Sequence, residues 1–340
     1  MTTTNKNQKD AISNFEESDQ GEDFAYISKQ LDKAQAQIGN VIFGQSEVVN
    51  KTLVTLLSGG HVLLIGVPGL AKTLLVETMA KVLGLSSGRI QCTPDLMPAD
   101  IVGSEVLEED EKGVRSFRFI PGPVFAQFVM ADEINRATPR TQSALLQAMQ
   151  ENVVTVNGTN HPLPRPFHVL ATQNPIEQEG TYPLPEAQLD RFLMQIDVSY
   201  PGADSEREMM LATTTGEEKQ VSRVFEDNDL KMAQNLVHNM PVGESIVDLI
   251  LQTIRKFRPQ EGADPQINEF VQWGPGPRAS QALMLSCRAR ALLDGRQTPA
   301  PEDVLSIAPS VLKHRMALNF KARSQGMRKS DLIQAMLKKL

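Results

Sequence analysis

The sequence Gly66-Val67-Pro68-Gly69-Leu70-Ala71-Lys72-Thr73 lies between an apolar run at 61–65, which predicts a buried strand, and a helical pattern at 72–83. A glycine loop in this context turns backbone amides and a helix N-terminus toward an anion. The context therefore predicts a phosphate-binding P-loop. Lys72 is expected to reach the β- and γ-phosphates of a nucleotide, and the Thr73 hydroxyl is expected to ligate Mg²⁺.

One position departs from the usual pattern, because Ala71 stands where a second glycine is common. Alanine leaves the backbone amide free and adds one methyl group, so we expect binding provided that Ala71 has a negative φ. The alternative is a turn that happens to contain Gly-x-x-Gly. The strand and helix around the loop favour nucleotide binding.

Composition limits the class of protein. The chain has 340 residues, 41% of them hydrophobic, and a net charge of −7, which argues against indiscriminate nucleic-acid binding. From Lys313 onward there are eight Lys or Arg residues and one Asp. This basic cluster is interpreted first as a solvated helical face, with a patch for an acidic partner or a neighbouring subunit as the alternative.

The termini and cysteines indicate a cellular compartment. Cys92 and Cys287 form neither a disulfide framework nor a Cys/His metal pattern, which suits a reducing cytoplasm. The N-terminus has no apolar signal segment, and no apolar run approaches membrane-spanning length. We therefore expect a soluble cytoplasmic protein without membrane insertion, with a disordered tail at residues 1–24.

Apolar patterning predicts alternating strands and helices as far as residue 200. The expected strands are 61–65, 89–92, 127–131, 168–172 and 192–196, and the expected helices are 27–38, 46–57, 72–83 and 139–150. Residues 94–123 are expected to be irregular apart from a short turn, and 153–156 begins a β-hairpin with an Asn157-Gly158 turn. The alternation predicts a parallel sheet with helices on both faces.

After Tyr200-Pro201-Gly202 the pattern changes to helices, with no clear strands. They are expected at 204–214, 228–238, 244–257, 278–293, 301–312 and 329–339. We therefore predict an α/β core at 25–200 and an all-α domain at 201–340.

Polar residues that could carry chemistry follow the predicted strands. Asp132-Glu133 follows one of them, so Asp132 is assigned to Mg²⁺ and Glu133 to the attacking water. Asn174 follows the next and could hydrogen-bond the water or the γ-phosphate, or could simply form a turn before Pro175. Residues after the strands of a parallel sheet share one edge, where ligands bind.

Two arginines could supply positive charge during phosphoryl transfer. Arg191 is either a surface cation or an arginine finger. Arg278 either caps a helix or reaches the same phosphates when the second domain closes as a lid. The five histidines are scattered and suggest no metal site.

Taken together, the motifs resemble those of MoxR-family AAA+ ATPases. The matching segments are Gly66–Thr73, Ala131–Ala137, Ala171–Pro175, Gly180–Phe192 and Gly276–Ala279, and the resemblance covers about residues 25–320. It implies a P-loop AAA+ αβα core followed by a helical lid. It also makes Ala71 an ordinary residue for this family.

The resemblance implies roles for individual residues. Asn174 would be sensor 1, Arg278 sensor 2, and Arg191 the finger that completes a neighbouring subunit's site, with Arg136 as the next candidate. Residues 96–123 resemble the insertion in helix 2 of this clade, and 153–163 resemble the hairpin before sensor 1. Three residues are expected near the adenine of the nucleotide: Ile42, Gly44 and Gln45. The loop residues expected to contact the nucleotide are Gly66, Val67, Pro68, Gly69, Leu70, Ala71, Lys72, Thr73 and Leu74.

The resemblance also implies a function: an ATP hydrolase with ATP and Mg²⁺ as cofactors. Such proteins form rings, typically hexamers, and act as chaperones for protein partners, often with a von Willebrand factor A domain. The alternatives are a nucleic-acid motor or restriction subunit, a magnesium-chelatase-type subunit and a non-catalytic scaffold. Few aromatic residues and the acidic balance disfavour nucleic acid, and the intact set Lys72, Asp132 and Glu133 disfavours a scaffold.

Overall fold

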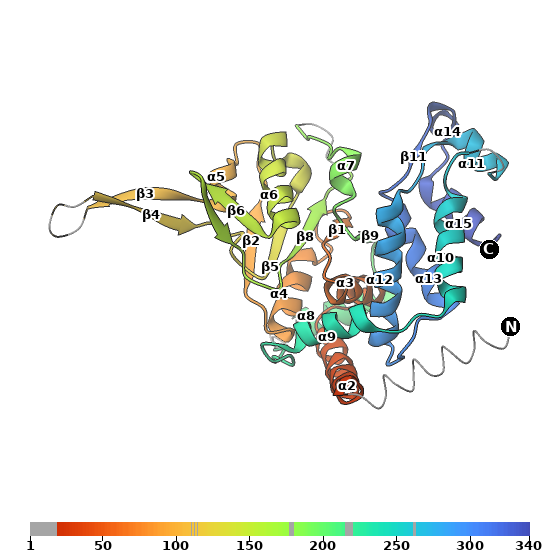
Figure 1. Ribbon diagram of the computed structural model, residues 1–340, viewed down its shortest axis with the longest axis horizontal. Helices are drawn as coiled ribbons and strands as arrows, with labels where there is room; N and C mark the ends of the chain where they lie inside the picture. The colour runs from red at the N-terminus through yellow and green to blue at the C-terminus, as the bar shows by residue number, and fades with distance from the viewer. Residues whose placement is uncertain are drawn as a thin grey trace.

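Five parallel strands form the central sheet of the computed structural model (Figure 1), which describes residues 19–109, 111, 113, 115–176, 180–214, 220–260 and 263–340. They are β1 (Val62–Ile65), β2 (Ser87–Gln91), β5 (Phe128–Asp132), β8 (His168–Gln173) and β9 (Met194–Asp197). Their order is β2-β5-β8-β1-β9, and every pair is parallel. The predicted parallel sheet is confirmed, although β9 begins at Met194 rather than at 192.

Helices cover both faces of this sheet. Val62 and Leu64 of β1 join one apolar cluster and Leu63 joins the other, as expected where side chains alternate between faces. The first cluster includes α2 (Asp19–Gly39), α3 (Ser46–Leu57) and α4 (Lys72–Val82), and the second includes α6 (Pro139–Glu151). Burial on both faces explains why β1 is apolar throughout.

The irregular structure predicted for 94–123 is wrong for most of that segment. It contains α5 (Pro98–Val102) and an antiparallel hairpin of β3 (Gly103–Glu109) and β4 (Arg115–Pro121). We call this hairpin the arm, and Figure 1 shows it extending away from the sheet on the side opposite the C-terminal helices. Most of its residues are exposed or half-buried, so the buried apolar face that would have identified its strands is missing.

The second predicted hairpin is confirmed as β6 (Val153–Val156) and β7 (Thr159–Pro162). Asn157 and Gly158 at its turn have φ of 47° and 83°, as a tight hairpin turn requires. It also supports the arm. The His161 ring stacks on Phe119 with centroids 3.8 Å apart, and the Asn157 amide donates to the Glu105 carboxylate over 2.8 Å.

The C-terminal part is helical, as predicted, and in Figure 1 its first helices lie beneath the sheet and the later ones on the side away from the arm. Its helices are α8 (Ala203–Thr214), α9 (Asp229–Asn239), α10 (Glu244–Lys256), α11 (Pro265–Phe270), α12 (Pro277–Leu293), α13 (Pro301–Leu312), α14 (Phe320–Ser324) and α15 (Lys329–Leu337). The expected absence of strands is wrong, because β10 (Val271–Trp273) pairs with β11 (Ala317–Leu318). These strands are too short to show a period in sequence.

The structure changes the N-terminal limit of the predicted core and leaves its C-terminal limit open. Helix α2 begins at Asp19, so residues 19–24 of the predicted tail are helical, and residues 1–18 lie outside the described residues. One apolar cluster continues from α3 through α9 into α12, so the division at residue 200 stays a prediction. Among the described residues, we find no helix with the length and apolar character needed to cross a membrane.

Candidate functional site

The P-loop leaves the sheet at Gly66, whose amide donates to the Gln173 carbonyl on β8 over 3.2 Å. A Cβ at Gly66 would lie 2.8 Å from the carbonyl oxygen of Val198, so this position requires glycine. Farther along, Gly69 and Ala71 have φ of 82° and 53°. Where residues with left-handed backbone conformation lie next to residues with right-handed conformation, successive backbone amides point to one side and form an anion-binding concavity.

The negative φ that we set as a condition for Ala71 is not found. Ala71 is the left-handed N-cap of α4, with φ 53° and ψ 25°, and α4 begins at the next residue. The loop turns into the first helical turn immediately after Leu70, and a left-handed residue makes that sharp change of direction. The conformation costs an alanine about 1–2 kcal/mol, which the rest of the loop must offset.

Lys72 lies against the loop and near two carboxylates. Its ammonium donates to the Gly66 carbonyl over 2.6 Å. Burial lowers the pKa of Lys72, and the negative charges of Asp132 and Glu133 act in the opposite direction. Thr73 follows in the first turn of α4. The predicted phosphate-binding and carboxylate residues therefore meet at the edge where β1 and β5 end.

A residue that the sequence analysis missed, Thr172 on β8, organises both carboxylate-bearing residues. Its buried hydroxyl donates to Asp132 Oδ1 over 2.7 Å and accepts from the Glu133 amide over 2.8 Å. Glu133 has φ 55°, so this hydrogen bond supports a left-handed conformation. The only signal in sequence was a hydroxyl two residues before Asn174.

Arginines engage the same two carboxylates. Arg89 on β2 pairs with Asp132 over 2.9 Å, and Arg136 of the 3₁₀ turn η1 (Ile134–Arg136) pairs with Glu133 over 2.9 Å. A carboxylate that ligates a metal or orients water must exchange these contacts for that role. Arg136, our second candidate finger, thus lies at its own chain's carboxylates.

Asn174 is buried next to the P-loop, because it follows Gln173. Its side-chain oxygen accepts from the Ile176 amide over 3.1 Å, which forms the turn before the chain leaves the sheet. The turn interpretation of Asn174 is therefore observed, and its contact with water or the γ-phosphate stays a prediction. It shapes a turn, and it lies at the edge where the P-loop and carboxylates meet.

Among the residues expected near adenine, Gln45 contacts the loop. It donates to the Leu70 carbonyl over 3.2 Å, and Ile42 is buried in the same core cluster as Leu70. Gly44 has φ 69°, and a Cβ there would lie 2.5 Å from Ser205 Cβ. Gly44 and Gln45 also line a cavity of about 350 Å³ between the core and α13 and α15. Of the other predicted loop contacts, Val67 is half-buried, and Pro68, Gly69 and Leu74 are exposed.

Arg191 and Arg278 lie at the opposite edge of the sheet. Together they line a cavity of about 310 Å³ with residues 59–61, which precede β1, whereas the P-loop follows β1. Four strand residues at about 3.3 Å each separate these edges by roughly 13 Å. Arg278 therefore does not lie at its own chain's phosphate-binding edge in this structure, and its reach to those phosphates by lid closure stays a prediction. Arg278 instead pairs with Asp190, beside Arg191, over 3.5 Å.

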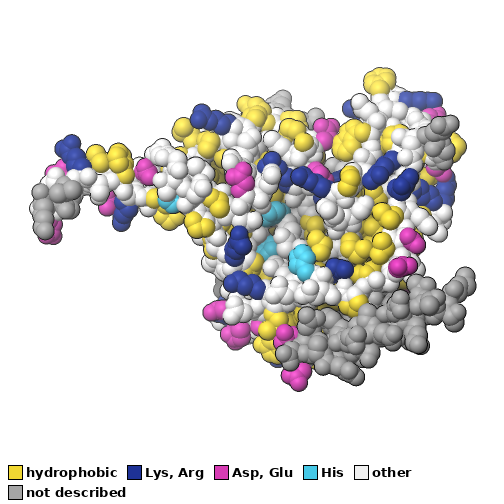
Figure 2. All heavy atoms as spheres, in the orientation of Figure 1, with side chains coloured by type: hydrophobic (Ala, Val, Ile, Leu, Met, Phe, Trp, Pro, Cys, Tyr) yellow, Lys and Arg dark blue, Asp and Glu magenta, His cyan; other side chains and the backbone are white. Residues whose placement is uncertain are grey.

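A third arginine, Arg315, also missed from sequence, underlies this pair. Its side chain is 4% exposed and pairs with Asp190 over 2.7 Å. It also donates to the carbonyls of Asp190, Phe192, Leu193 and Val311 over 2.7–3.2 Å. Next to it, His314 Nε2 lies 2.9 Å from the Phe192 carbonyl. In Figure 2, Lys and Arg side chains gather where the C-terminal helices meet the core.

The C-terminal basic cluster is largely engaged in ion pairs. Lys313, Arg315, Lys321, Arg328 and Lys339 pair with Asp197, Asp190, Glu269, Asp331 and Asp264 respectively. These pairs neutralise much of the local charge. The segment is accordingly a poor electrostatic footprint for nucleic acid.

The known proteins that match this chain agree with the geometry. The model of the ATPase family associated with various cellular activities (AAA) matches residues 61–194, and the AAA lid domain model matches 266–336. The chaperone MoxR1 of Mycobacterium tuberculosis is 44% identical over 295 residues, 86% of this chain and 77% of that protein. The chain belongs to the MoxR family of AAA ATPases. The resemblance predicted from sequence is confirmed.

Other relatives cover this MoxR ATPase almost from end to end. YeaC of Bacillus subtilis is 40% identical over 90% of this chain and 93% of its own length, and the protein MoxR of Paracoccus denitrificans is 33% identical over 84% and 88%. A crystal structure from Cytophaga hutchinsonii, 39% identical, superposes with a TM-score of 0.88 over 96% of this chain and 98% of that one. The predicted AAA core and helical lid are thus confirmed.

Family membership implies nucleotide binding, and the donor set of this MoxR ATPase fits ATP with Mg²⁺. The Lys72 ammonium and the amides of the left-handed loop suit phosphate oxygens. The Thr73 hydroxyl and the Asp132 carboxylate are oxygen ligands of the kind that Mg²⁺ prefers. These ligands share the edge with Glu133 and Asn174, where a γ-phosphate and water would meet.

Proposed function

We propose that this MoxR ATPase assembles into rings, most simply hexamers, and couples ATP hydrolysis to chaperone-like maturation of a protein partner. One observation supports the ring above all. The P-loop and carboxylates lie at one edge of the sheet, and Arg191 and Arg278 lie at the other. Each subunit thus holds two complementary halves of a phosphoryl-transfer site, and a head-to-tail ring joins them.

The phosphate half acts through residues of one subunit. Lys72 and the loop amides hold the β- and γ-phosphates, and Thr73 and Asp132 hold Mg²⁺, which when bound neutralises developing phosphate charge. Glu133 releases Arg136 and orients the attacking water as general base. Asn174 hydrogen-bonds the water or the γ-phosphate.

The arginine half comes from the neighbour. Arg191 is half-buried and Arg278 is 62% exposed, so both can extend toward an adjoining surface. Their charge stabilises the transferring phosphoryl group, a role worth about 10³–10⁵ in rate for an arginine finger. We choose Arg191 over Arg136 as the finger because Arg136 is paired with Glu133 of its own chain.

The arm is the proposed client contact. It carries exposed apolar side chains, with Leu107 54% and Phe117 71% exposed, and these two are cross-strand partners. Its base is tied to the second hairpin through Phe119 and His161, so the two insertions move together. The chaperone name of a relative and the family resemblance suggest a protein client, of which a von Willebrand factor A domain is the first choice.

Mixing subunits tests the ring site. Arg191→Ala keeps an intact phosphate half, and Glu133→Gln keeps an intact arginine half. Each variant alone should hydrolyse ATP at least about 10³-fold more slowly than the parent, with nucleotide binding retained. An equimolar mixture should regain activity, because some interfaces combine the two intact halves. A mixture as inactive as its components would refute the shared site.

Client capture tests the chaperone function. Glu133→Gln protein loaded with ATP and Mg²⁺ should retain a protein from cell lysate that ADP-loaded protein does not. The same variant with Phe117→Ser should lose the capture, because the arm would lose its most exposed aromatic ring. If nucleic acid is the only ATP-dependent ligand, or if Phe117→Ser captures equally well, the proposed contact is wrong.

A further inference from the structure

The segment that carries Arg191 is held in place by the lid. The Asp190 carboxylate accepts from Arg315 through Oδ1 at 2.7 Å and faces Arg278 through Oδ2 at 3.5 Å. Asp190 thus links two lid arginines and precedes Arg191 in the chain. Any shift of Asp190 moves both members of the arginine half-site.

Arg315 is well suited to fix this segment. Its guanidinium makes hydrogen bonds to the carbonyls of residues 190, 192 and 193 and to that of Val311 near the end of α13. A planar fork with five donors can make these contacts together, whereas the single ammonium of lysine cannot. The charge is buried, which is tolerable because a carboxylate and several carbonyls surround it.

We propose that Arg315 is a positioning residue for ATP hydrolysis in the neighbouring subunit: it locks Asp190–Leu193 to the lid so that Arg191 and Arg278 are presented as one preorganised pair. The inference deepens the proposed ring function and rests on it. Movement of the lid is then transmitted to the neighbour's phosphates through the Arg315–Asp190 contact. The nucleotide site of the subunit that carries Arg315 is not involved.

The spatial arrangement distinguishes this role from general stabilisation. Leu193 also donates its amide to the His61 carbonyl over 2.8 Å, so the segment is anchored to the start of β1 as well as to the lid. With Arg315 altered, the anchor at His61 still keeps the segment near the sheet. What is lost is the fixed orientation of the residues before it, which include Arg191.

Arg315→Lys tests the proposal, with Asp190→Asn as a second variant that breaks the same contact from the other side. Each should bind a fluorescent ATP analogue within about threefold of the parent, because the P-loop lies at the other edge. Each should hydrolyse ATP about 10- to 100-fold more slowly, as expected when a catalytic group is misplaced by about 1 Å. Thermal unfolding and sedimentation establish that the variants are folded and assembled.

The decisive readout is rescue in mixed rings. Arg315→Lys subunits have a sound phosphate half, so addition of Glu133→Gln subunits, whose arginine half is intact, should restore hydrolysis. In random equimolar rings about a quarter of the interfaces combine the two sound halves, so the regained rate should approach about a quarter of the parent's. A variant whose own phosphate half was damaged would not be rescued by a partner that cannot itself hydrolyse ATP.

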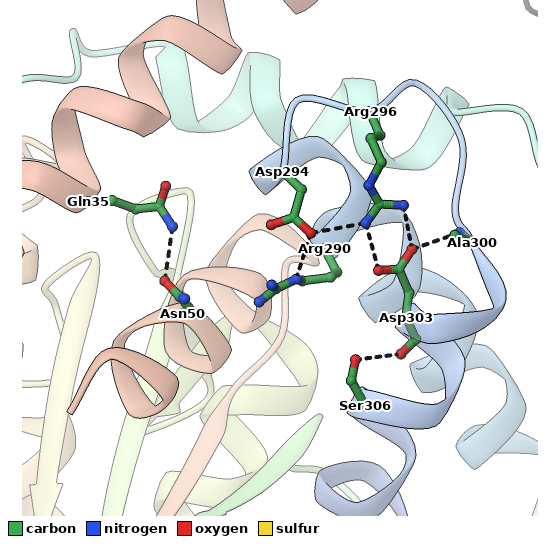
Figure 3. Close-up of polar contacts among 8 residues, drawn as sticks. All are labelled: Gln35, Asn50, Arg290, Asp294, Arg296, Ala300, Asp303 and Ser306. Carbon is green, nitrogen blue, oxygen red and sulfur yellow. Dashed lines mark hydrogen bonds and ion pairs between the residues drawn. The ribbon is translucent and has the colours of Figure 1, made fainter. Parts of the chain in front are cut away.

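Arg296→Lys is the matched control. Figure 3 shows Arg296 in a comparable lid network, with two bonds to Asp303 at 2.7 and 2.8 Å and one to Asp294 at 3.0 Å. None of these partners belongs to the 190–193 segment. The same substitution there should leave the hydrolysis rate within about twofold of the parent.

The outcomes separate this inference from the ring proposal. If Arg191→Ala is rescued by Glu133→Gln and neither Arg315→Lys nor Asp190→Asn is, the positioning role is overturned and the shared site stands. If Arg315→Lys and Asp190→Asn keep the parent's rate, the role is likewise overturned. If Arg191→Ala is not rescued, the shared site itself fails, and the positioning role fails with it.

Discussion

Thr172→Val should slow ATP hydrolysis without removing nucleotide binding. Thr172 is completely buried on β8 and joins the two carboxylate-bearing residues through one hydroxyl. That hydroxyl donates to Asp132 Oδ1 over 2.7 Å and accepts from the Glu133 amide over 2.8 Å. Valine has nearly the same shape, so the substitution removes the hydrogen bonds and leaves the packing.

The structure gives the size of the effect. A hydrogen bond to a charged group contributes about 1.5–3 kcal/mol, and a buried N–H without a partner costs about 1–3 kcal/mol. The left-handed conformation of Glu133 costs about 1–2 kcal/mol, so the Thr172 contact is large enough to maintain it. If about 3 kcal/mol of this support is lost, turnover should fall by up to about 100-fold.

Steady-state ATP hydrolysis and titration with a fluorescent ATP analogue measure the two properties separately. Affinity should change little, since Lys72 and the loop amides are untouched. Thr172→Ser is the control, because it keeps the hydroxyl and should remain within about threefold of the parent rate. If Thr172→Val turns over as fast as Thr172→Ser, the hydroxyl does not organise these carboxylates and our reasoning is wrong.

Three further predictions concern the same region. Burial lowers the pKa of His61 to about 3 and that of His168 to about 4. As the pH falls below 6.5, these imidazoles are protonated in the unfolded chain before they are protonated in the folded protein. Thermal unfolding should therefore show a stability loss of about 1.4 kcal/mol per histidine per pH unit toward pH 4. Gly69→Ala should weaken nucleotide binding through strain at φ 82° alone, since a Cβ there meets nothing within 4 Å, whereas Ala71→Gly should preserve it. Arg89→Gln should lower the Mg²⁺ concentration for half-maximal hydrolysis by up to about fivefold, because a half-exposed cation would no longer compete for Asp132.

The central strands β1, β5 and β8 were predictable because both of their faces are buried. The run Val62–Ile65 is apolar throughout, as a central parallel strand requires. The arm was not predictable for the complementary reason. Its strands β3 and β4 pair only with one another in a two-stranded sheet and are largely exposed, so they carry neither a buried run nor a clean alternation.

Arg315 illustrates how tertiary contacts change the meaning of a charge. In sequence it is one of eight basic residues after 312, and a solvated face was the natural interpretation. In the structure its partner Asp190 lies 125 positions earlier, and Arg315 is buried against this half-buried carboxylate where the lid meets the core. Nothing local distinguishes it from Arg323, which is exposed on α14.

The position of Arg191, in contrast, follows from an argument that the sequence already contained. In a parallel sheet, residues that follow strands share one edge and residues that precede them share the other. Asp132 ends β5 and Asn174 follows β8, whereas Arg191 precedes β9. Its separation from its own P-loop was therefore implied once the sheet was parallel, and this separation is what supports the proposed second subunit. No such rule predicts the position of Arg278, because that position depends on how the lid packs against the core.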